Sequence, residues 1–123
     1  MNIGDQKSTS RAFTASDIDD YIALGGAKPG ADIVPEPLIG GLFSYLLGVE
    51  LPGPGTMYLK QETDFIAPAR VGDTLTAKVE ITQLRPEKKL IDLRTSCRDG
   101  DGALVADGRA LVYLDAPHWP VTG

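Results

Sequence analysis

The segment that most constrains the fold is LIGGLFSYLLG, residues 38–48, in which nearly every position is apolar or small. It follows Pro35 and Pro37, as a helix start allows. A helix that is apolar on all sides is expected to be buried. Gly40 and Gly41 each lower helix propensity by roughly 1 kcal/mol relative to Ala, so we expect them to permit close packing by another element. The rest of the chain must therefore surround this helix.

From Thr56 onward the hydrophobic period changes from 3.6 to 2 residues, which is typical of strands. Turn sequences rich in Pro, Gly and Asp separate four alternating sets, at residues 57–66, 74–82, 91–97 and 103–114. We interpret these as an antiparallel meander. Because a sheet and a helix each need a partner for their apolar faces, the sequence predicts an α+β hotdog fold, with an antiparallel sheet wrapped around a long central helix.

The chain length of 123 residues fits a single domain, residues 1–123, with a core of about residues 11–115. Thr14 and Asp17 have the capping-box spacing, which predicts a short helix that ends at Gly25-Gly26. Only the first ten residues and the tail after Leu114 are expected to be loosely held. The open edge and apolar rim of such a sheet predict a homodimer or a dimer-based oligomer.

Composition excludes several functions. The net charge is -5 and the Lys and Arg residues are scattered, so neither nucleic acid nor an anionic membrane is an expected partner. No apolar run has the length of a membrane span or a signal peptide, so we expect a cytoplasmic protein. With one Cys, Cys97, and one His, His118, we expect no disulfide, no metal site and no cofactor. Chemistry would rest on carboxylates, hydroxyls and backbone amides.

A longer segment has a specific resemblance. GLFSYLLGVELPGPGTMYLKQETDFIAPARVGDTLTAKVEIT, residues 41–82, resembles the MaoC-like hydratases, which include R-specific enoyl-CoA hydratases and 3-hydroxyacyl dehydratases. The helix, the LPG turn, the YLxQxxxF strand, the Pro68 turn and the VGDTLTA segment carry the resemblance, which extends from about Phe13 to Leu114. It implies the hotdog fold and a hydro-lyase that acts on acyl-CoA or acyl-carrier-protein thioesters.

The resemblance also locates the family's catalytic loop, of the form DxNPxH, between the two helices. Its Asp and His hold a water molecule and move its proton, which is general acid–base catalysis. With Pro29 at the position of the motif's proline, Gly26 takes the Asp position and Ala31 takes the His position. The loop is also shorter, and the family's HGM segment is here Pro35-Glu36-Pro37. We therefore expect no ordinary hydratase catalysis in this single chain.

Three functions then remain open. In the first, the chain binds a thioester without the Asp/His pair, alone or beside a catalytic heteromeric partner, with Ser44 and the Glu36 amide in contact with the substrate. In the second, it is a thioesterase-like enzyme in which Glu36, with Asp32 as the weaker candidate, acts as the general base. The third alternative is an interaction module without a small-molecule site. A binding or catalytic protein would keep open a tunnel lined by Leu38, Leu42, Phe43, Tyr45 and Met57.

Each of these residues also has a purely structural interpretation. Ser44 can bond a carbonyl of its own helix, and Glu36 can interact favourably with the positive end of the helix. Asp32 suits a solvated loop, and Cys97 is expected to be a small buried side chain. Gln61 and Pro68 suit a strand and its end, LPGPG suits a rigid turn, and His118 suits a solvated tail.

Overall fold

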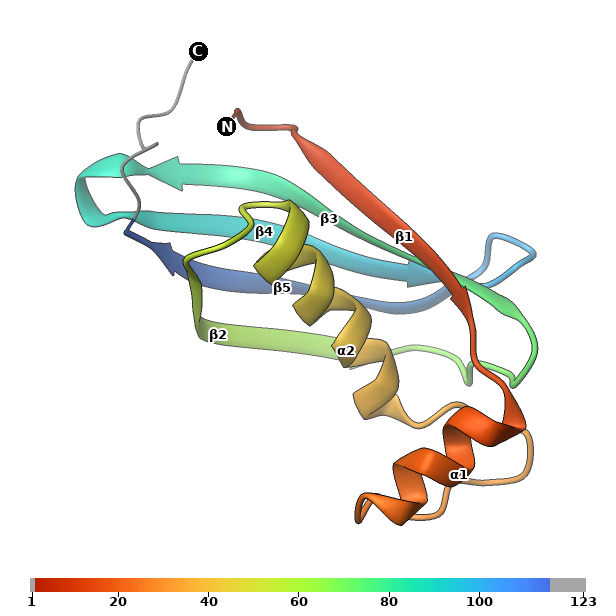
Figure 1. Ribbon diagram of the computed structural model, residues 1–123. Helices are drawn as coiled ribbons and strands as arrows, with labels where there is room; N and C mark the ends of the chain where they lie inside the picture. Colours follow the sequence, from red (N-terminus) through yellow and green to blue (C-terminus); the bar gives the residue numbers. More distant parts are fainter. Residues whose placement is uncertain (1, 116–123) are drawn as a thin grey trace.

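The computed structural model describes residues 2–115. The elements in chain order are β1 (Gln6–Ala12), α1 (Ala15–Ala23), α2 (Glu36–Tyr45), the π-helical turn η1 (Leu46–Glu50), β2 (Thr56–Phe65), β3 (Thr74–Arg85), the 3₁₀ turn η2 (Pro86–Lys88), β4 (Leu90–Arg98) and β5 (Leu104–Leu114). The five strands form one antiparallel sheet in the order β1-β3-β4-β5-β2. The sheet curves around α2 (Figure 1), and the predicted hotdog fold is confirmed.

The core lies between α2 and the central strands. Alternate residues of β3 and β4 are fully buried, as their period of 2 predicts. They pack beneath the inner face of α2 and η1, which contributes Ile39, Leu42, Phe43, Leu46 and Leu47. The opposite face of the helix is open in the single chain, because Ser44, Tyr45 and Val49 are exposed. The expectation of a helix buried on all sides is therefore wrong for the isolated chain.

The neighbours of β2 differ from the prediction. A meander is correct for β3, β4 and β5, but β2 pairs with β5 at the far edge, from Thr56↔Leu114 to Phe65↔Ala106. Alternating hydrophobicity indicates a strand but does not say which strand lies beside it. The register also shifts between Tyr58 and Lys60, so a bulge interrupts the alternation that the sequence suggests.

The prediction that the first ten residues are loosely held is wrong. β1 pairs with β3 over its whole length, from Gln6↔Glu80 to Ala12↔Thr74. Its sequence, QKSTSRA, has no apolar alternation, because an edge strand held by backbone hydrogen bonds can keep most of its side chains in solvent. The sheet therefore has two unlike edges: β1 is polar along its length, whereas the first half of β2 exposes apolar side chains and its second half exposes polar ones.

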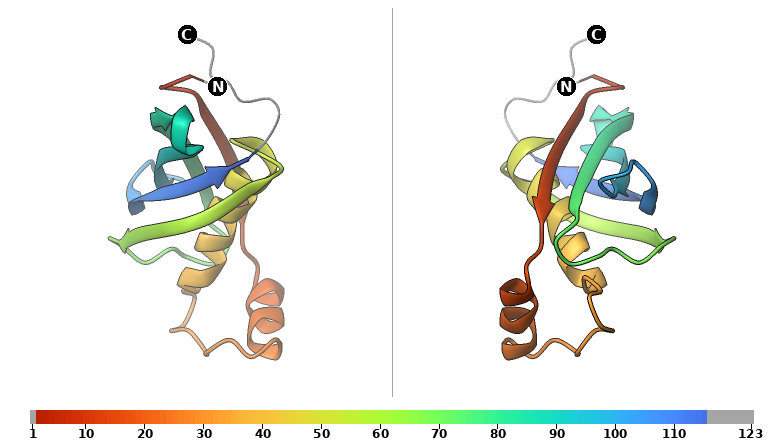
Figure 2. Two further views of the ribbon diagram at one scale, coloured as in Figure 1. Left: turned by 90° about the vertical axis from the view of Figure 1, so that its left-hand side faces the viewer. Right: turned by 90° about the vertical axis from the view of Figure 1, so that its right-hand side faces the viewer.

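Helix α1 lies apart from the sheet. Figure 2 shows it beyond the end of α2 in two opposite side views, and none of residues Ala15–Ala23 is buried. The predicted capping box is present: Asp17 N–H donates to Thr14 Oγ1 at 3.2 Å, and Thr14 N–H donates to the Asp17 carboxylate at 2.8 Å. These bonds satisfy amides that lack partners within the helix, so α1 can begin without support from a core.

Among residues 2–115, no helix has both the length and the apolar character that crossing a membrane requires.

Candidate functional site

The loop between α1 and α2 contains the positions that the resemblance assigns to the catalytic pair. Gly26 N–H donates to the Tyr21 carbonyl at 3.0 Å, which folds the chain back onto the end of α1. A Cβ atom at residue 26 would overlap the ring of Tyr21. Residue 26 has no carboxylate because it is a glycine. The clash shows in addition that an aspartate would not fit there unless the Tyr21 ring turned away. Ala31 is exposed farther along the same loop.

The second half of this loop is attached to the segment between β2 and β3. Val34 N–H donates to the Ala69 carbonyl at 2.8 Å, and Val71 N–H donates to the Asp32 carbonyl at 2.9 Å. Ile33 and Arg70 form an isolated antiparallel bridge between them. The short loop thus runs directly to the start of α2, with its backbone fixed on both sides of Ile33.

Glu36 is the first residue of α2 and lines a hollow of about 360 Å³, which we call the helix-start hollow. Of its nine lining residues within the described chain, Glu36 is the only charged one, and Pro68 is another of them. The other lining residues are apolar: Ile33, Val34, Ile39, Phe65, Ile66, Ala67 and Ala69. Glu36 itself is exposed, so the single chain does not provide the burial expected of a relocated general base.

Asp32 lies in a different hollow. This α1 hollow, of about 410 Å³, is formed by α1, the loop from Lys28 to Ile33, and Val71. Asp32 is exposed and adopts a left-handed backbone conformation with φ 58°. Ala31 lines the same hollow. The two carboxylates proposed from the sequence, Asp32 and Glu36, therefore open into separate spaces and do not form an acid–base pair in one hollow.

The five residues predicted to line a tunnel lie in three different parts of the structure. Leu38, Leu42 and Tyr45 line a groove of about 410 Å³ between α2 and β1, which we call the β1 groove. Phe43 is fully buried in the core, whereas Met57 is 60% exposed on the edge strand β2. The structure thus brings three of the five residues together and places the other two elsewhere.

Ser44 faces the edge strand. The Tyr58 hydroxyl donates to Ser44 Oγ at 3.3 Å, which connects α2 to β2. Burial raises the pKa of Tyr58, and the hydrogen bond to Ser44 opposes that rise. At neutral pH the phenol is a neutral hydrogen-bond donor. The pair can orient a polar group of a ligand. Within the part of the chain that the structure describes, the side chain bonded to the Ser44 hydroxyl is a phenol, not the general base that a nucleophile would need.

The remaining chemistry is limited. Cys97 is buried, and burial raises its pKa to about 11, so its thiol is protonated and unreactive at neutral pH. Among residues 2–115, no three His, Cys, Asp or Glu side chains lie close enough to hold a metal ion. His118 lies outside the described residues.

Sequence reasoning missed two residues that the structure places beside these spaces. Arg11 and Tyr58 are both adjacent to predicted ligand-contacting residues, Arg11 in the β1 groove and Tyr58 on Ser44. The alternation of Thr9, Arg11 and Phe13 was a usable signal, because alternate residues of a strand share one face. The segment QKSTSRA has no apolar alternation, so the sequence pattern does not predict a strand there.

Fold and site together define a hotdog protein with an open cleft at the start of its central helix. No protein-family model matches the chain. Individual relatives do match: an (R)-specific enoyl-CoA hydratase of Aeromonas caviae is 34% identical over 128 residues, which cover 93% of this chain and 96% of the relative. The solved structure of the A. caviae (R)-hydratase involved in PHA biosynthesis has a TM-score of 0.84 and 34% identity, and covers 94% of this chain and 98% of that one.

A second relative, an (R)-specific enoyl-CoA hydratase of Rhodospirillum rubrum, is 47% identical over 79 residues. That match covers 64% of this chain and 54% of the relative, so the chain matches about half of the relative's length. The match to A. caviae extends over nearly all of both chains. The protein belongs to the MaoC-like family of (R)-specific enoyl-CoA hydratases.

Proposed function

We propose that this chain binds acyl thioesters, as acyl-CoA or on an acyl carrier protein, but lacks the ordinary hydratase reaction. The observation that carries the proposal is the loop between α1 and α2, which has Gly26 and Ala31 at the positions implied for the catalytic Asp and His. The fixed backbone from Asp32 to Val34 supports the same conclusion, because it holds the loop in a short path. A thioester would lie over the helix-start hollow, with its carbonyl toward the positive end of α2.

Crotonyl-CoA tests this proposal. Purified protein should bind it in a calorimetric titration, yet hydrate it at least about 10²-fold more slowly than an ordinary family member, because one missing acid–base group typically costs about 10²–10⁴ in rate. Loss of the enoyl absorbance is the readout. Rapid hydration that persists in Asp32→Asn and Glu36→Gln would mean that an unassigned group catalyses the reaction, and the proposal would be wrong.

A second candidate function is supported by the position of Glu36. Among residues 2–115 it is the sole charged residue on the helix-start hollow, and it stands at the first position of α2. If a second copy or a bound thioester covers the hollow, Glu36 becomes a general base for thioester hydrolysis. Glu36→Gln should then abolish release of free CoA while the melting temperature stays within a few degrees. Asp32→Asn is the matched control, since Asp32 lines the other hollow.

A further proposal concerns the protein with which this chain associates. The exposed apolar side chains of β2 suit a second copy of the chain, and we propose a homodimer. A catalytically equipped hotdog chain at the same edge is the heteromeric alternative, since it would supply the acid and base that this chain lacks. Hydration that appears only on mixing with such a chain would distinguish the two assemblies.

A further inference from the structure

The β1 groove contains an unusual charged residue. Among its nine lining residues in the described chain, Arg11 is the only one that carries a charge. Apolar walls come from both sides, with Phe13 near β1 and Leu38 and Leu42 on α2. The groove is open over Gly41, because no atom lies within 4 Å of where its Cβ would be. The groove therefore combines a mostly apolar channel with one cation on its β1 side.

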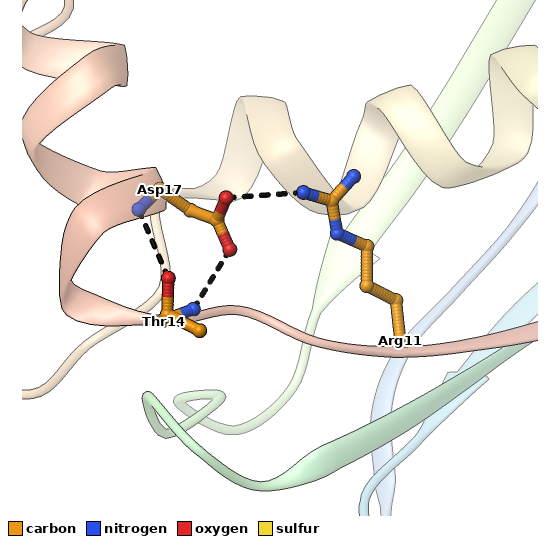
Figure 3. Close-up of polar contacts among 3 residues, drawn as sticks. All are labelled: Arg11, Thr14 and Asp17. Atoms are coloured by element: carbon orange, nitrogen blue, oxygen red, sulfur yellow. Dashed lines mark hydrogen bonds and ion pairs between the residues drawn. The ribbon is translucent and has the colours of Figure 1, made fainter.

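Arg11 is held in place by two contacts. Its Nη2 atom lies 3.2 Å from the Asp17 carboxylate, and its guanidinium carbon lies 4.7 Å from the centre of the Phe13 ring. Figure 3 shows how the contact is arranged: one Asp17 oxygen faces Arg11, while the other accepts the Thr14 N–H. A guanidinium has five N–H donors, and the bond to Asp17 uses only one nitrogen. Arg11 is thus oriented, with donors to spare.

These features match one chemical group. A guanidinium fork suits the oxygens of a phosphate, and prior orientation lowers the entropy that binding would cost. Thr9, which is partly buried and lies on the same face of β1, adds a hydroxyl to the groove. The apolar walls suit a chain of methylene and methyl groups. Phosphopantetheine, the arm shared by CoA and acyl carrier proteins, combines such a chain with a phosphate.

We propose that the β1 groove binds the phosphopantetheine arm of the thioester and that Arg11 binds its phosphate. This inference rests on the proposed function, since it extends the same ligand from the helix-start hollow along the exposed side of α2. Asp17 competes for the guanidinium, so the phosphate would share Arg11 with that carboxylate. The contribution of Arg11 to thioester affinity should consequently weaken as salt concentration rises.

The test compares three crotonyl thioesters: the CoA ester, the phosphopantetheine ester and the N-acetylcysteamine ester, which has no phosphate. Calorimetry gives each affinity for the wild type and for Arg11→Gln. We expect Arg11→Gln to weaken the first two by about tenfold, as expected for one charge-assisted hydrogen-bonding contact. The N-acetylcysteamine ester should change by less than about twofold. A crotonylated carrier protein, added as a fourth ligand, shows whether the protein-borne arm is bound in the same way.

The matched control is Arg94→Gln. Arg94 is an exposed arginine that also lies 3.2 Å from one carboxylate, that of Asp107, but it stands on β4 outside the groove. The Arg94→Gln variant should bind all of the crotonyl thioesters with the affinity of the wild type. Equal losses for the phosphorylated and unphosphorylated esters in Arg11→Gln, or no loss for any, would overturn the phosphate site. If the wild type bound no crotonyl ester at all, the proposed function would fail first, and the phosphate site with it.

Discussion

Thr95 is a buried polar residue whose hydroxyl makes no hydrogen bond within the described chain. Its side chain is fully buried on β4, between Val79 of β3 and Gly108 of β5. Its hydroxyl has no hydrogen-bond partner among the described residues. A buried polar group without a partner costs about 1–3 kcal/mol. Thr95 therefore lowers the stability of the core in which it is packed.

Thr95→Val should raise the free energy of unfolding by about 1 kcal/mol, because a methyl group replaces an unsatisfied hydroxyl of nearly the same size. Urea denaturation measures the change. Thr82→Val is the comparison, since the Thr82 hydroxyl donates to the Asp92 carbonyl at 3.2 Å and its loss removes a bond. A destabilised Thr95→Val protein would show that the hydroxyl has a partner, such as a buried water molecule.

At the scale of an element, α1 depends on its cap more than on its packing. A helix of nine residues is marginal in isolation, and none of residues Ala15–Ala23 is buried. The hydrogen bond from the Thr14 backbone N–H is the largest of the effects that hold the pKa of Asp17 below its usual 3.8. The ionised carboxylate is therefore the form that stabilises the helix start.

This pKa shift predicts the direction of a pH effect. Because the pKa is lower in the folded state, the stabilising contribution of the Asp17 carboxylate is complete above its unfolded pKa of 3.8. It is lost as pH falls through the folded value. Amide chemical shifts of α1 in NMR spectra should move toward unfolded values in this range, before those of β3 and β4. Asp17→Asn should remove the pH dependence, and an unchanged profile in that variant would assign the effect to another group.

The elements differ in how far the sequence predicts them. The periods of α2, β3, β4 and β5 follow from burial on one face, so the pattern indicates both the element and its inner side. β1 lacks that pattern, because its backbone rather than its side chains attaches it to β3. The site residues were harder to group. Positions 38, 43 and 44 point in different directions around a helix of 3.6 residues per turn, so closeness in sequence does not define one pocket.

For the whole molecule, the decisive feature is the contrast between the two sheet edges. Along β1 the exposed side chains are mainly polar, whereas the first half of β2 exposes Met57, Tyr58 and Leu59, and only its second half is polar. Tyr45 and Val49, on α2 and η1, are also exposed. Unpaired strand edges and apolar surfaces both favour association. The proposed second copy is therefore expected at β2 rather than at β1.

Leu59→Lys should convert the proposed dimer into a monomer of 13.1 kDa in light scattering. Leu59 is 52% exposed, so a charge there should oppose association without disturbing the core. Ser8→Lys places the same residue on the opposite edge and should leave the dimer intact. Dissociation by Ser8→Lys alone would move the interface to β1.

The position of the Tyr21 ring has a consequence for protein engineering. A Cβ atom at residue 26 would overlap that ring, so an aspartate cannot be introduced there without displacing the ring. A histidine at residue 31 would stand in a loop whose later part is fixed to residues 69–71. Introducing the implied pair would need a rearranged Tyr21 side chain and a longer loop at the same time. A design that adds acid–base catalysis to this chain would therefore succeed more readily with a group elsewhere or with a catalytic partner chain.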